Sequence, residues 1–478
     1  MSEDRLTGLD ESFLHLESDS AHMHVAGLML LSGEPPAYDE LLEGIEARLH
    51  LVPRYRQRLA FVPYGQGRPR WVDDPHLNLS YHVRATALPA PGSEEQLRAL
   101  AGRVFSQGLD RDKPLWEMWI VHGVEGGRFA VLSKTHHALV DGVSGVDIVS
   151  VLFDTKPEPD APPDPGRAWL ARPLPSGPQL LAEALVERVT RPAGLAASAV
   201  SLMRRPMEAV SAAGAAVSGL AAMVGTTLRP APTTPYNQSI GPHRRFAWVR
   251  CSLADVKAVK DELGGTVNDV MVATVAGALR RHLRRRGVAT DGLELKAMIP
   301  VSVRSDDARG ALGNQVAAMM ATLPVGVGDP VARLTAVSEE MRDAKGGGQA
   351  VGARVLTELT GFAPPTIMSQ AARLAAVQRV FNLVITNIPG PQFPLYLHGR
   401  ELLDLMPMVP LAQNQALGVA IMSYNGRISF GLNADYDALP DLDDLALDVR
   451  GSLDELAAAA GLDVDAELSV ERAGALRA

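Results

Sequence analysis

Hydrophobic positions in the first third of the chain switch between the two-residue period of a strand and the longer period of a helix. A mainly apolar run predicts a strand over residues 24–31, and spaced leucine and isoleucine residues predict an amphipathic helix over 38–51. A second helix is expected over 94–107. β-Branched and aromatic residues predict a strand over 128–135, after which the helical spacing returns over 143–153.

From residue 245 onward the same mixture of patterns returns. A strand is expected over 246–252 and a helix over 253–263, and residues 267–286 have the strongest helical pattern of the chain. Further strand-like segments, with helices between them, cover residues 295–303, 316–323, 383–387, 417–424 and 428–434. This mixed order predicts an α/β fold, an α+β sandwich, and disfavours an all-helical or all-β chain.

Prolines separate these two regions. Residues 154–166 hold five prolines among acidic residues, which neither a helix interior nor a central strand accommodates. A helical stretch follows over 179–227, and we therefore divide the chain into regions 1–153, 154–244 and 245–478. Arginines beside apolar positions in the middle region suit a helix on an anionic membrane surface and, equally, a crossover linker packed on the protein.

Composition and charge narrow the class of protein. The 478 residues, 46% of them apolar, are enough for two domains with separate cores, and a net charge of −9 disfavours a dedicated nucleic-acid binder. The only cysteine, Cys251, excludes an intramolecular disulfide and fits a reducing compartment. The charged start lacks the apolar core of a secretory signal, and the uncharged window 209–228 is weakly hydrophobic for a membrane span. A cytoplasmic protein is expected.

The densest chemistry of the chain lies at residues 136–142, directly after the strand predicted over 128–135. His136 and His137 are followed by Asp141 and Gly142, and an imidazole can take and return a proton near neutral pH. One histidine is therefore a candidate general base. Neighbouring residues point in different directions, so only one of the two is expected to meet a substrate.

Two other interpretations of this cluster remain open. A histidine beside an apolar strand is often a hydrogen-bonded core residue. His137 and Asp141 also have the four-residue spacing of two metal ligands on one helical face, with His22 and His24 as further donors. Since no other compact pair of ligands accompanies them, we expect no metal.

The cluster occurs together with several other motifs. The first set is His136-His137-x-x-x-Asp141-Gly142, Pro114-Leu115-Trp116-Glu117, Asn268-Asp269-Val270 and Asn387-Ile388-Pro389-Gly390-Pro391; the second is Leu9-Asp10-Glu11-Ser12-Phe13, Met23-His24-Val25, Pro300-Val301-Ser302-Val303-Arg304 and Leu312-Gly313-Asn314-Gln315. Together they resemble, from end to end, the bacterial wax ester synthase/diacylglycerol acyltransferase family. The histidine motif alone also occurs in peptide-forming condensation domains. The resemblance implies two related domains with the fold of chloramphenicol acetyltransferase and a tunnel with the reactive histidine at their interface.

The resemblance also implies substrates and roles. Acyl-CoA would donate its acyl group to diacylglycerol or a long-chain alcohol, without a cofactor, and His137 would remove the hydroxyl proton while His136 is structural. Asn268, or a backbone amide near Gly142, would stabilise the oxyanion, although Asn268 is equally suited to hold the interface together. Asp141 would stabilise the loop by pairing with Arg56 or, as a second candidate, Arg304.

Further residues acquire roles from the same resemblance. Pro114, Leu115 and Trp116 would form the acyl-binding wall or, alternatively, ordinary core, and Ser144 and Asp269 would contact substrate. The arginines at 280, 281 and 284–286 could meet CoA phosphates, but a solvated helix end explains them better. The competing functions are condensation of carrier-protein substrates and a non-catalytic role at a lipid surface. The protein could lie peripherally on the inner membrane face or on lipid inclusions; the sequence does not predict its acceptor preference or oligomeric state.

Overall fold

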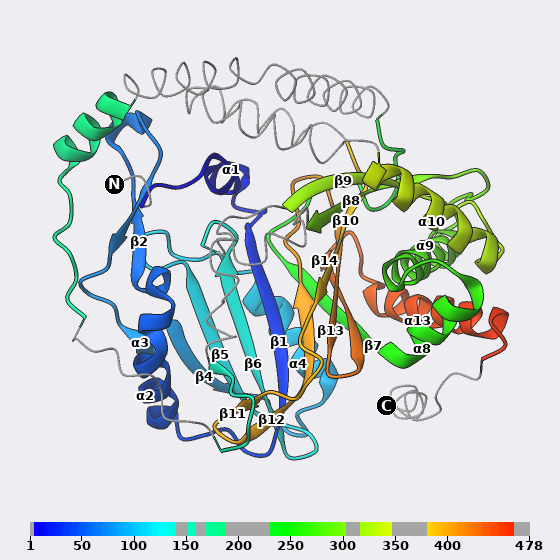
Figure 1. Cartoon of the computed structure of the whole chain (residues 1–478), viewed down its shortest axis with the longest axis horizontal. Helices are drawn as coiled ribbons and strands as arrows, with labels where there is room; N and C mark the ends of the chain where they lie inside the picture. Colours follow the sequence, from blue (N-terminus) through cyan, green and yellow to red (C-terminus); the bar gives the residue numbers. More distant parts are fainter. Residues whose placement is uncertain are drawn as a thin grey trace, which may run out of the picture.

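A computed structural model describes residues 4–139, 152–158, 169–187, 230–302, 316–346 and 380–462. Within these residues the chain forms two six-stranded sheets and a short two-stranded sheet (Figure 1). The predicted mixed α/β fold is confirmed. Where a strand or helix was predicted and is described, it starts and ends within a few residues of the predicted range; no range was predicted for several others, among them β5 (Trp116–Val124), β12 (Arg400–Met408) and α13 (Leu442–Ala459). The helix predicted over 143–153, the helical stretch over 179–227 and the window 209–228 lie wholly or mostly outside the described residues.

The first sheet has the order β11-β12-β1-β6-β5-β4. Neighbouring strands of this sheet run antiparallel, except that β4 and β5 run parallel to each other. The strands are β1 (His24–Ser32), β4 (Val83–Ala87), β5 (Trp116–Val124), β6 (Arg128–His136), β11 (Tyr396–Leu397) and β12 (Arg400–Met408).

Helices cover both faces of this sheet. Met29 and Leu31 of β1 pack in one core with α2 (Tyr38–Arg48), whereas Leu28 and Leu30 pack in another with α4 (Glu94–Phe105). Alternate side chains of a strand point to opposite faces, so a strand buried on both faces has a nearly continuous apolar sequence, as β1 does. The remaining described elements of this part are α1 (Gly8–Leu16), the short helices η1 (Leu49–Leu51), η2 (Pro53–Arg56), η3 (Pro63–Gly65) and α3 (Leu79–His82), and the strand pair β2 (Gln57–Ala60) and β3 (Arg70–Asp73).

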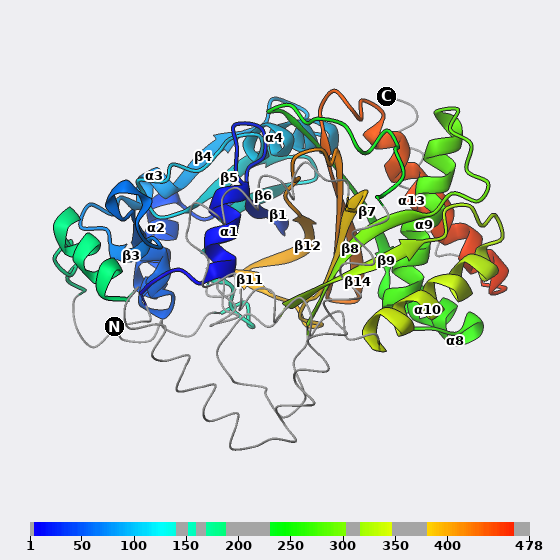
Figure 2. The same cartoon turned by 90° about the horizontal axis from the view of Figure 1, so that it is seen from above.

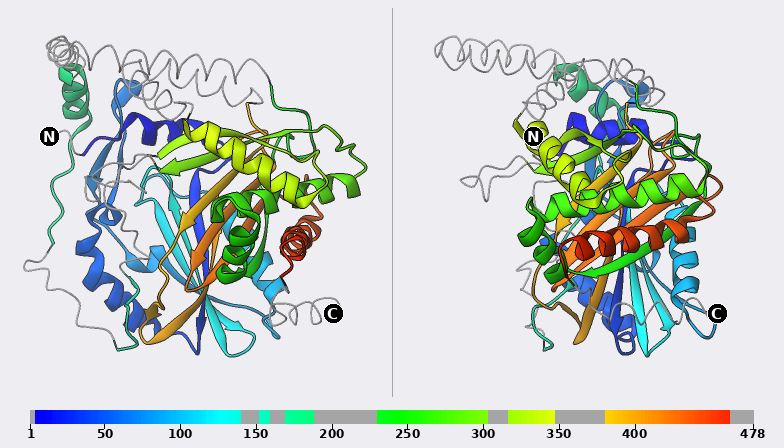
Figure 3. Two further views of the ribbon diagram at one scale, coloured as in Figure 1. Left: turned by 45° about the vertical axis from the view of Figure 1, so that its right-hand side comes forward. Right: turned by 90° about the vertical axis from the view of Figure 1, so that its right-hand side faces the viewer.

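The second sheet has the order β7-β14-β13-β10-β8-β9. Its strands are β7 (Arg244–Ser252), β8 (Leu295–Ser302), β9 (Val316–Leu323), β10 (Leu383–Pro389), β13 (Leu417–Tyr424) and β14 (Arg427–Asp435). On one face lie α8 (Leu253–Leu263), α9 (Val267–Arg285), α10 (Pro330–Gly346) and α13 (Leu442–Ala459), with α9 beside α13 (Figure 3). The other face is turned toward the first sheet (Figure 2).

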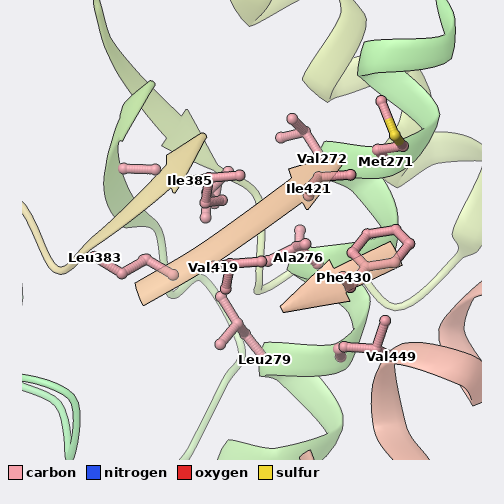
Figure 4. Packing of buried hydrophobic residues seen from close by; sticks show 14 of the residues in the cluster. Met271, Val272, Ala276, Leu279, Leu383, Ile385, Val419, Ile421, Phe430 and Val449 are labelled. Atoms are coloured by element: carbon pink, nitrogen blue, oxygen red, sulfur yellow. The ribbon is translucent and has the colours of Figure 1, made fainter. Parts of the chain in front are cut away.

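The core of the second sheet is centred on α9. Val272, Ala276 and Leu279 of this helix lie beside the strand residues Val419 and Ile421 (Figure 4). Every residue from Asp269 to Leu279 is buried, so the first half of α9 is enclosed by its neighbours on all sides. Polar residues return only toward its C-terminal end, where arginines reach neighbouring elements.

Two strands from the later part of the chain, β11 and β12, belong to the first sheet. β12 follows the second sheet's β10 in sequence but pairs with β1 in the first sheet, with Ala26 opposite Met408 and Leu30 opposite Asp404. The predicted region 245–478 therefore contributes to both sheets. The local pattern of β12 does not contain this information, because it specifies a strand without specifying its partner.

Side chains also join the two sheets directly. Phe105 of α4 meets Phe246 of β7 edge to face, with ring centroids 5.2 Å apart. Arg250 of β7 pairs with Glu94 at 2.9 Å and with Asp404 of β12 at 3.1 Å, and the Arg250 side chain is only 5% exposed. Apolar and ionic contacts therefore hold the sheets in one arrangement.

Candidate active site

The two adjacent histidines lie at the end of β6, where the strand turns away from its sheet. The backbone N–H of His136 donates to the carbonyl of Leu115 at 2.9 Å, and that of His137 donates to the carbonyl of Met23 at 2.8 Å. The turn is thus attached on one side to the start of β5 and on the other to the residue before β1. Their side chains then enter different surroundings.

The ring of His137 lies where the two sheets meet. It stacks on Phe13, with centroids 3.9 Å apart and planes inclined by 20°. Phe13 packs against the core of the second sheet and Met23 is buried within that core, although both precede β1 in the chain. The sequence-predicted base is therefore at the junction of the sheets, as the family resemblance implied.

Burial controls the charge of His137. Removal of the ring from water lowers its pKa to about 4, opposed in part by its own backbone carbonyl and assisted by the nearby His136. The Nδ1 atom is buried and has no hydrogen-bond partner among the described residues. At neutral pH the ring is consequently neutral and able to accept a proton.

His136 has the contacts of a structural residue. The side chain is 1% exposed, and its Nδ1 accepts a hydrogen bond of 3.0 Å from the backbone N–H of Ala138. The other nitrogen, Nε2, therefore carries the proton and lies 3.6 Å from the Glu17 carboxylate. Burial by itself raises the pKa of Glu17, but His136 and Arg111 outweigh it and lower that pKa to about 2.

The Pro114-Leu115-Trp116 segment is largely core. Leu115 and Trp116 are at most 1% exposed, and the indole N–H of Trp116 donates to the Tyr55 carbonyl at 2.9 Å while its ring stacks on His82. Pro114 and Trp116 also line a surface pocket of about 420 Å³, and a second pocket of about 450 Å³ lies next to it. His137 lines neither pocket, so an acyl-binding wall here stays a prediction.

Two distant motifs meet at the start of α9. The side-chain amide of Asn387, at the end of β10, donates to Oδ1 of Asn268 at 3.0 Å. Asp269 instead caps the N-terminus of the helix. Its carboxylate accepts from the Thr266 N–H at 2.9 Å, and the Thr266 hydroxyl accepts from the Asp269 N–H at 3.2 Å. This capping box gives Asp269 a structural role, and a substrate contact for it stays a prediction.

Four predicted site residues fall in segments outside the described ranges. These are Asp141, Gly142, Ser144 and Arg304. Arg56, the proposed partner of Asp141, stacks its guanidinium 4.8 Å from the ring centre of Trp169, and its Nε has no hydrogen-bond partner in the described part of the chain. Pairing of Asp141 with Arg56 or Arg304 therefore stays a prediction.

The arginine cluster at the end of α9 is tied to neighbouring elements. Arg281 pairs with Glu455, Arg285 with Asp448 and Arg286 with Asp441, while Arg280 donates to the carbonyls of Val325 and Gly326. Three of these contacts join α9 to α13 and its N-cap, which favours the helix-end explanation over phosphate binding. Within the described ranges, no group of three histidine, cysteine, aspartate or glutamate residues could hold a metal ion.

Four contact residues were not identified from the sequence. Phe13 and Asn387 lay within the quoted motifs, but each acts through a partner far away in the chain. Glu17 and Arg111 belonged to no motif, and neither carries a local signal for a contact with His136.

Among the described helices, none combines the length and the hydrophobicity needed to cross a bilayer.

Comparison with known proteins identifies the family. The wax ester synthase/diacylglycerol acyltransferase catalytic domain matches residues 6–271, and the C-terminal domain of the same family matches residues 312–457. A Mycobacterium tuberculosis protein named as a diacylglycerol O-acyltransferase is 34% identical over 476 residues, covering 95% of this chain and 98% of the relative. Another from the same organism is 33% identical, covering 92% and 87%.

Solved structures agree with this assignment. The wax ester synthase/diacylglycerol acyltransferase from Marinobacter aquaeolei VT8 is 28% identical and superposes with a TM-score of 0.66, covering 96% of this chain and 100% of that one. The starter condensation domain of rhizomide synthetase, at 13% identity and a TM-score of 0.58, shares the fold alone. The resemblance inferred from the motifs is confirmed, and the chain belongs to the wax ester synthase/diacylglycerol acyltransferase family.

Proposed function

We propose that this protein is an O-acyltransferase that transfers a long-chain acyl group from acyl-CoA to the hydroxyl group of diacylglycerol or a long-chain alcohol. The observation that carries the proposal is the neutral, half-buried imidazole of His137 at the junction of the two sheets. Relatives that match the chain over nearly its whole length are named for this reaction. Acyl-CoA is a substrate here, and no cofactor is required.

The reaction needs one proton acceptor and a well-aligned pair of substrates. His137 takes the proton of the acceptor hydroxyl as its oxygen forms a bond to the thioester carbonyl carbon. The tetrahedral intermediate then collapses, the carbon–sulfur bond breaks, and the CoA thiolate receives the same proton. Because Nδ1 of His137 is buried, Nε2 is the nitrogen that we assign to this proton. Alignment of the two substrates supplies much of the rate, so no covalent acyl-enzyme is needed.

The negative charge on the carbonyl oxygen requires hydrogen-bond donors. Asn268 or a backbone amide near Gly142 is our candidate. Asn387 supports the first choice, since its amide donates to Oδ1 of Asn268 and leaves the Asn268 amide hydrogens free to point elsewhere. A variant at Asn268 that lowers kcat but leaves the unfolding midpoint unchanged would distinguish the oxyanion role from an interface role.

The place of action follows from the acceptors. Diacylglycerol and long-chain alcohols have very low solubility in water, because each exposed methylene costs about 0.8 kcal/mol. The protein would therefore collect its acceptor at a membrane or lipid-inclusion surface and act there as a peripheral cytoplasmic enzyme. Vesicle flotation with and without anionic lipid tests this location.

Release of free CoA thiol tests the reaction itself. The full chain is supplied with palmitoyl-CoA and either diacylglycerol or hexadecanol in vesicles. We expect thiol release that depends on the alcohol and disappears in a folded His137→Ala variant. Release unchanged in that variant would remove the proposed base. Acyl transfer only from an acyl-carrier protein, or vesicle binding without any turnover, would instead favour the condensation or the non-catalytic alternative.

A further inference from the structure

Helix α1 covers the reactive histidine with a single aromatic side chain. Phe13 stacks its ring nearly parallel to the imidazole of His137. Phe13 and Leu16 pack against the core of the second sheet, whereas Leu14 is buried in the core of the first. The helix therefore bridges the two sheets at the point where the imidazole lies, near the start of β1 (Figure 1).

The C-terminal end of α1 is anchored by Glu17. The Glu17 carboxylate accepts hydrogen bonds from the Arg111 guanidinium and, at 3.2 Å, from the backbone N–H of Met23. It also lies 3.6 Å from Nε2 of His136. Arg111 donates in addition to the Leu14 carbonyl at 3.0 Å. These contacts fix the helix relative to the residue that immediately precedes His137.

Little else among the described residues orients the imidazole. The hydrogen bond from the His137 N–H to Met23 holds the backbone but does not act on the two side-chain torsions. Nδ1 has no partner with hydrogen-bond geometry there, so apart from the ring's interaction with its own backbone carbonyl, the stacking on Phe13 is the contact that restricts rotation. A parallel ring at this distance also keeps water from one face of the imidazole.

We propose that Phe13 is a positioning residue for His137, and that Glu17, held by Arg111 and His136, fixes the helix that carries Phe13. The two histidines of the motif then have separate tasks. His136 helps to hold helix α1 in place through Glu17, and His137, stacked on Phe13 of that helix, accepts the proton. This inference rests on the proposed function, since it explains how the assigned base keeps its orientation.

Charged groups around the ring are accounted for separately. His136 adjoins it in the chain and lowers the pKa of His137 further. On α1, Glu11 is engaged with Arg68 at 3.5 Å and with His15 at 3.5 Å. Loss of the Phe13 ring should therefore act mainly by admitting water to the imidazole.

The test combines histidine NMR with kinetics on the full chain. The resonance of His137 in carbon-13-labelled protein is identified by its loss in His137→Asn. Phe13→Met keeps a side chain of similar size but removes the aromatic face. We expect its His137 resonance to titrate closer to the ordinary value of 6.5 and kcat to fall about tenfold, because a loosened base spends less time aligned. Phe13→Tyr should retain both wild-type readouts.

Leu16→Ala is the matched control, because Leu16 packs on the same second core but has no ring contact with His137. It should leave the His137 titration unchanged. If Phe13→Met does not fold, Glu17→Gln is measured in the same way and should shift the titration in the same direction. A wild-type titration together with wild-type kcat in the folded variant overturns the proposal. A shifted titration in a protein without any acyl transfer would instead overturn the proposed function and leave the positioning contact standing.

Discussion

Each half of this molecule contains a buried histidine beside a carboxylate and an arginine, and the two arrangements differ in what adjoins them. In the first half, His136 faces Glu17, which Arg111 also binds. In the second half, Nε2 of His282 lies 3.0 Å from Asp441, which Arg286 binds. The other ring nitrogen of His282, Nδ1, is hydrogen-bonded to the hydroxyl of Tyr236 at 2.8 Å.

In the first half, Nδ1 of His136 accepts instead from the backbone N–H of Ala138, and the residue that follows His136 in the chain is His137. That imidazole has no carboxylate beside it in the part of the chain that the structure describes. In both halves of this protein, a histidine–carboxylate pair therefore holds neighbouring elements together. The group that we propose to be reactive is the neighbouring histidine, His137, which lacks such a pair among the described residues and whose neutral form can accept a proton at neutral pH.

The largest expected effect separates His137 from both structural histidines. His137→Asn should lower kcat about a thousandfold, because the proton acceptor is lost, while the unfolding midpoint stays near that of the wild type. Thiol release under saturating substrate measures kcat. Equal kcat losses in His137→Asn and in a folded His282→Gln variant would abolish the distinction between the two regions.

The pH dependence sharpens the same distinction. The pKa of His137 is lowered to about 4, so its reactive neutral form persists as the pH falls below the ordinary value of 6.5. We expect kcat/KM to stay level down to an acid limb near pH 4 and then to fall about tenfold per pH unit. An acid limb near 6.5 would show that the imidazole is solvated. Activity recovered after a return to neutral pH controls for unfolding.

Glu17→Gln should destabilise the first arrangement. The side chain is 11% exposed, and the amide loses the charge that pairs with Arg111 and His136. We expect the free energy of unfolding to fall by about 1–3 kcal/mol, measured in urea, with kcat lowered as well. The wild-type pKa of about 2 lies below the ordinary 4.5, so this contribution is present above pH 4.5 and is lost as the pH falls toward 2.

Asp441→Asn should have a smaller and purely structural effect. Asp441 is 25% exposed, and Arg286 and His282 lower its pKa to about 2 although burial opposes this. We expect a loss of about 1 kcal/mol in the free energy of unfolding and an unchanged kcat. A fall in kcat comparable to that of Glu17→Gln would mean that the second arrangement also serves the reaction.

The smallest effect is expected at the surface of the second half. Arg281 and Glu455 are 40% and 39% exposed, and screened pairs of this kind contribute little. Arg281→Ala should change the free energy of unfolding by less than about 0.5 kcal/mol and leave KM for acyl-CoA unchanged. A clear rise in KM would restore the alternative in which this cluster binds CoA phosphates.

Local patterns predicted much of this fold because most elements have clear periodicity. The strands at β1, β6 and β13 and the long helix α9 were all expected close to their observed bounds. The crossing of β12 into the first sheet was not expected. Strand pairing between distant segments depends on the whole fold, and the sequence of β12 does not specify the strand with which it pairs.

The same limit applies to the site. A motif of two histidines placed the candidate base at a strand end, and the family resemblance implied that this base lies between the domains. The partners of the two rings, Phe13 and Glu17, were not predicted. The contact of Phe13 with His137 joins residues more than a hundred positions apart. Asp269 shows the opposite case, since its motif suggested substrate whereas Thr266, three residues earlier, could have indicated a capping box from the sequence alone.

The position of β12 has a consequence for dissecting the protein. The matched catalytic region ends at residue 271, well before Arg400–Met408. A fragment truncated there would expose the free edge of β1, a row of unpaired amides and carbonyls flanked by leucines. Such an edge is a template for self-association, so the half that carries the histidines should aggregate when expressed alone and regain solubility when the remaining half is co-expressed.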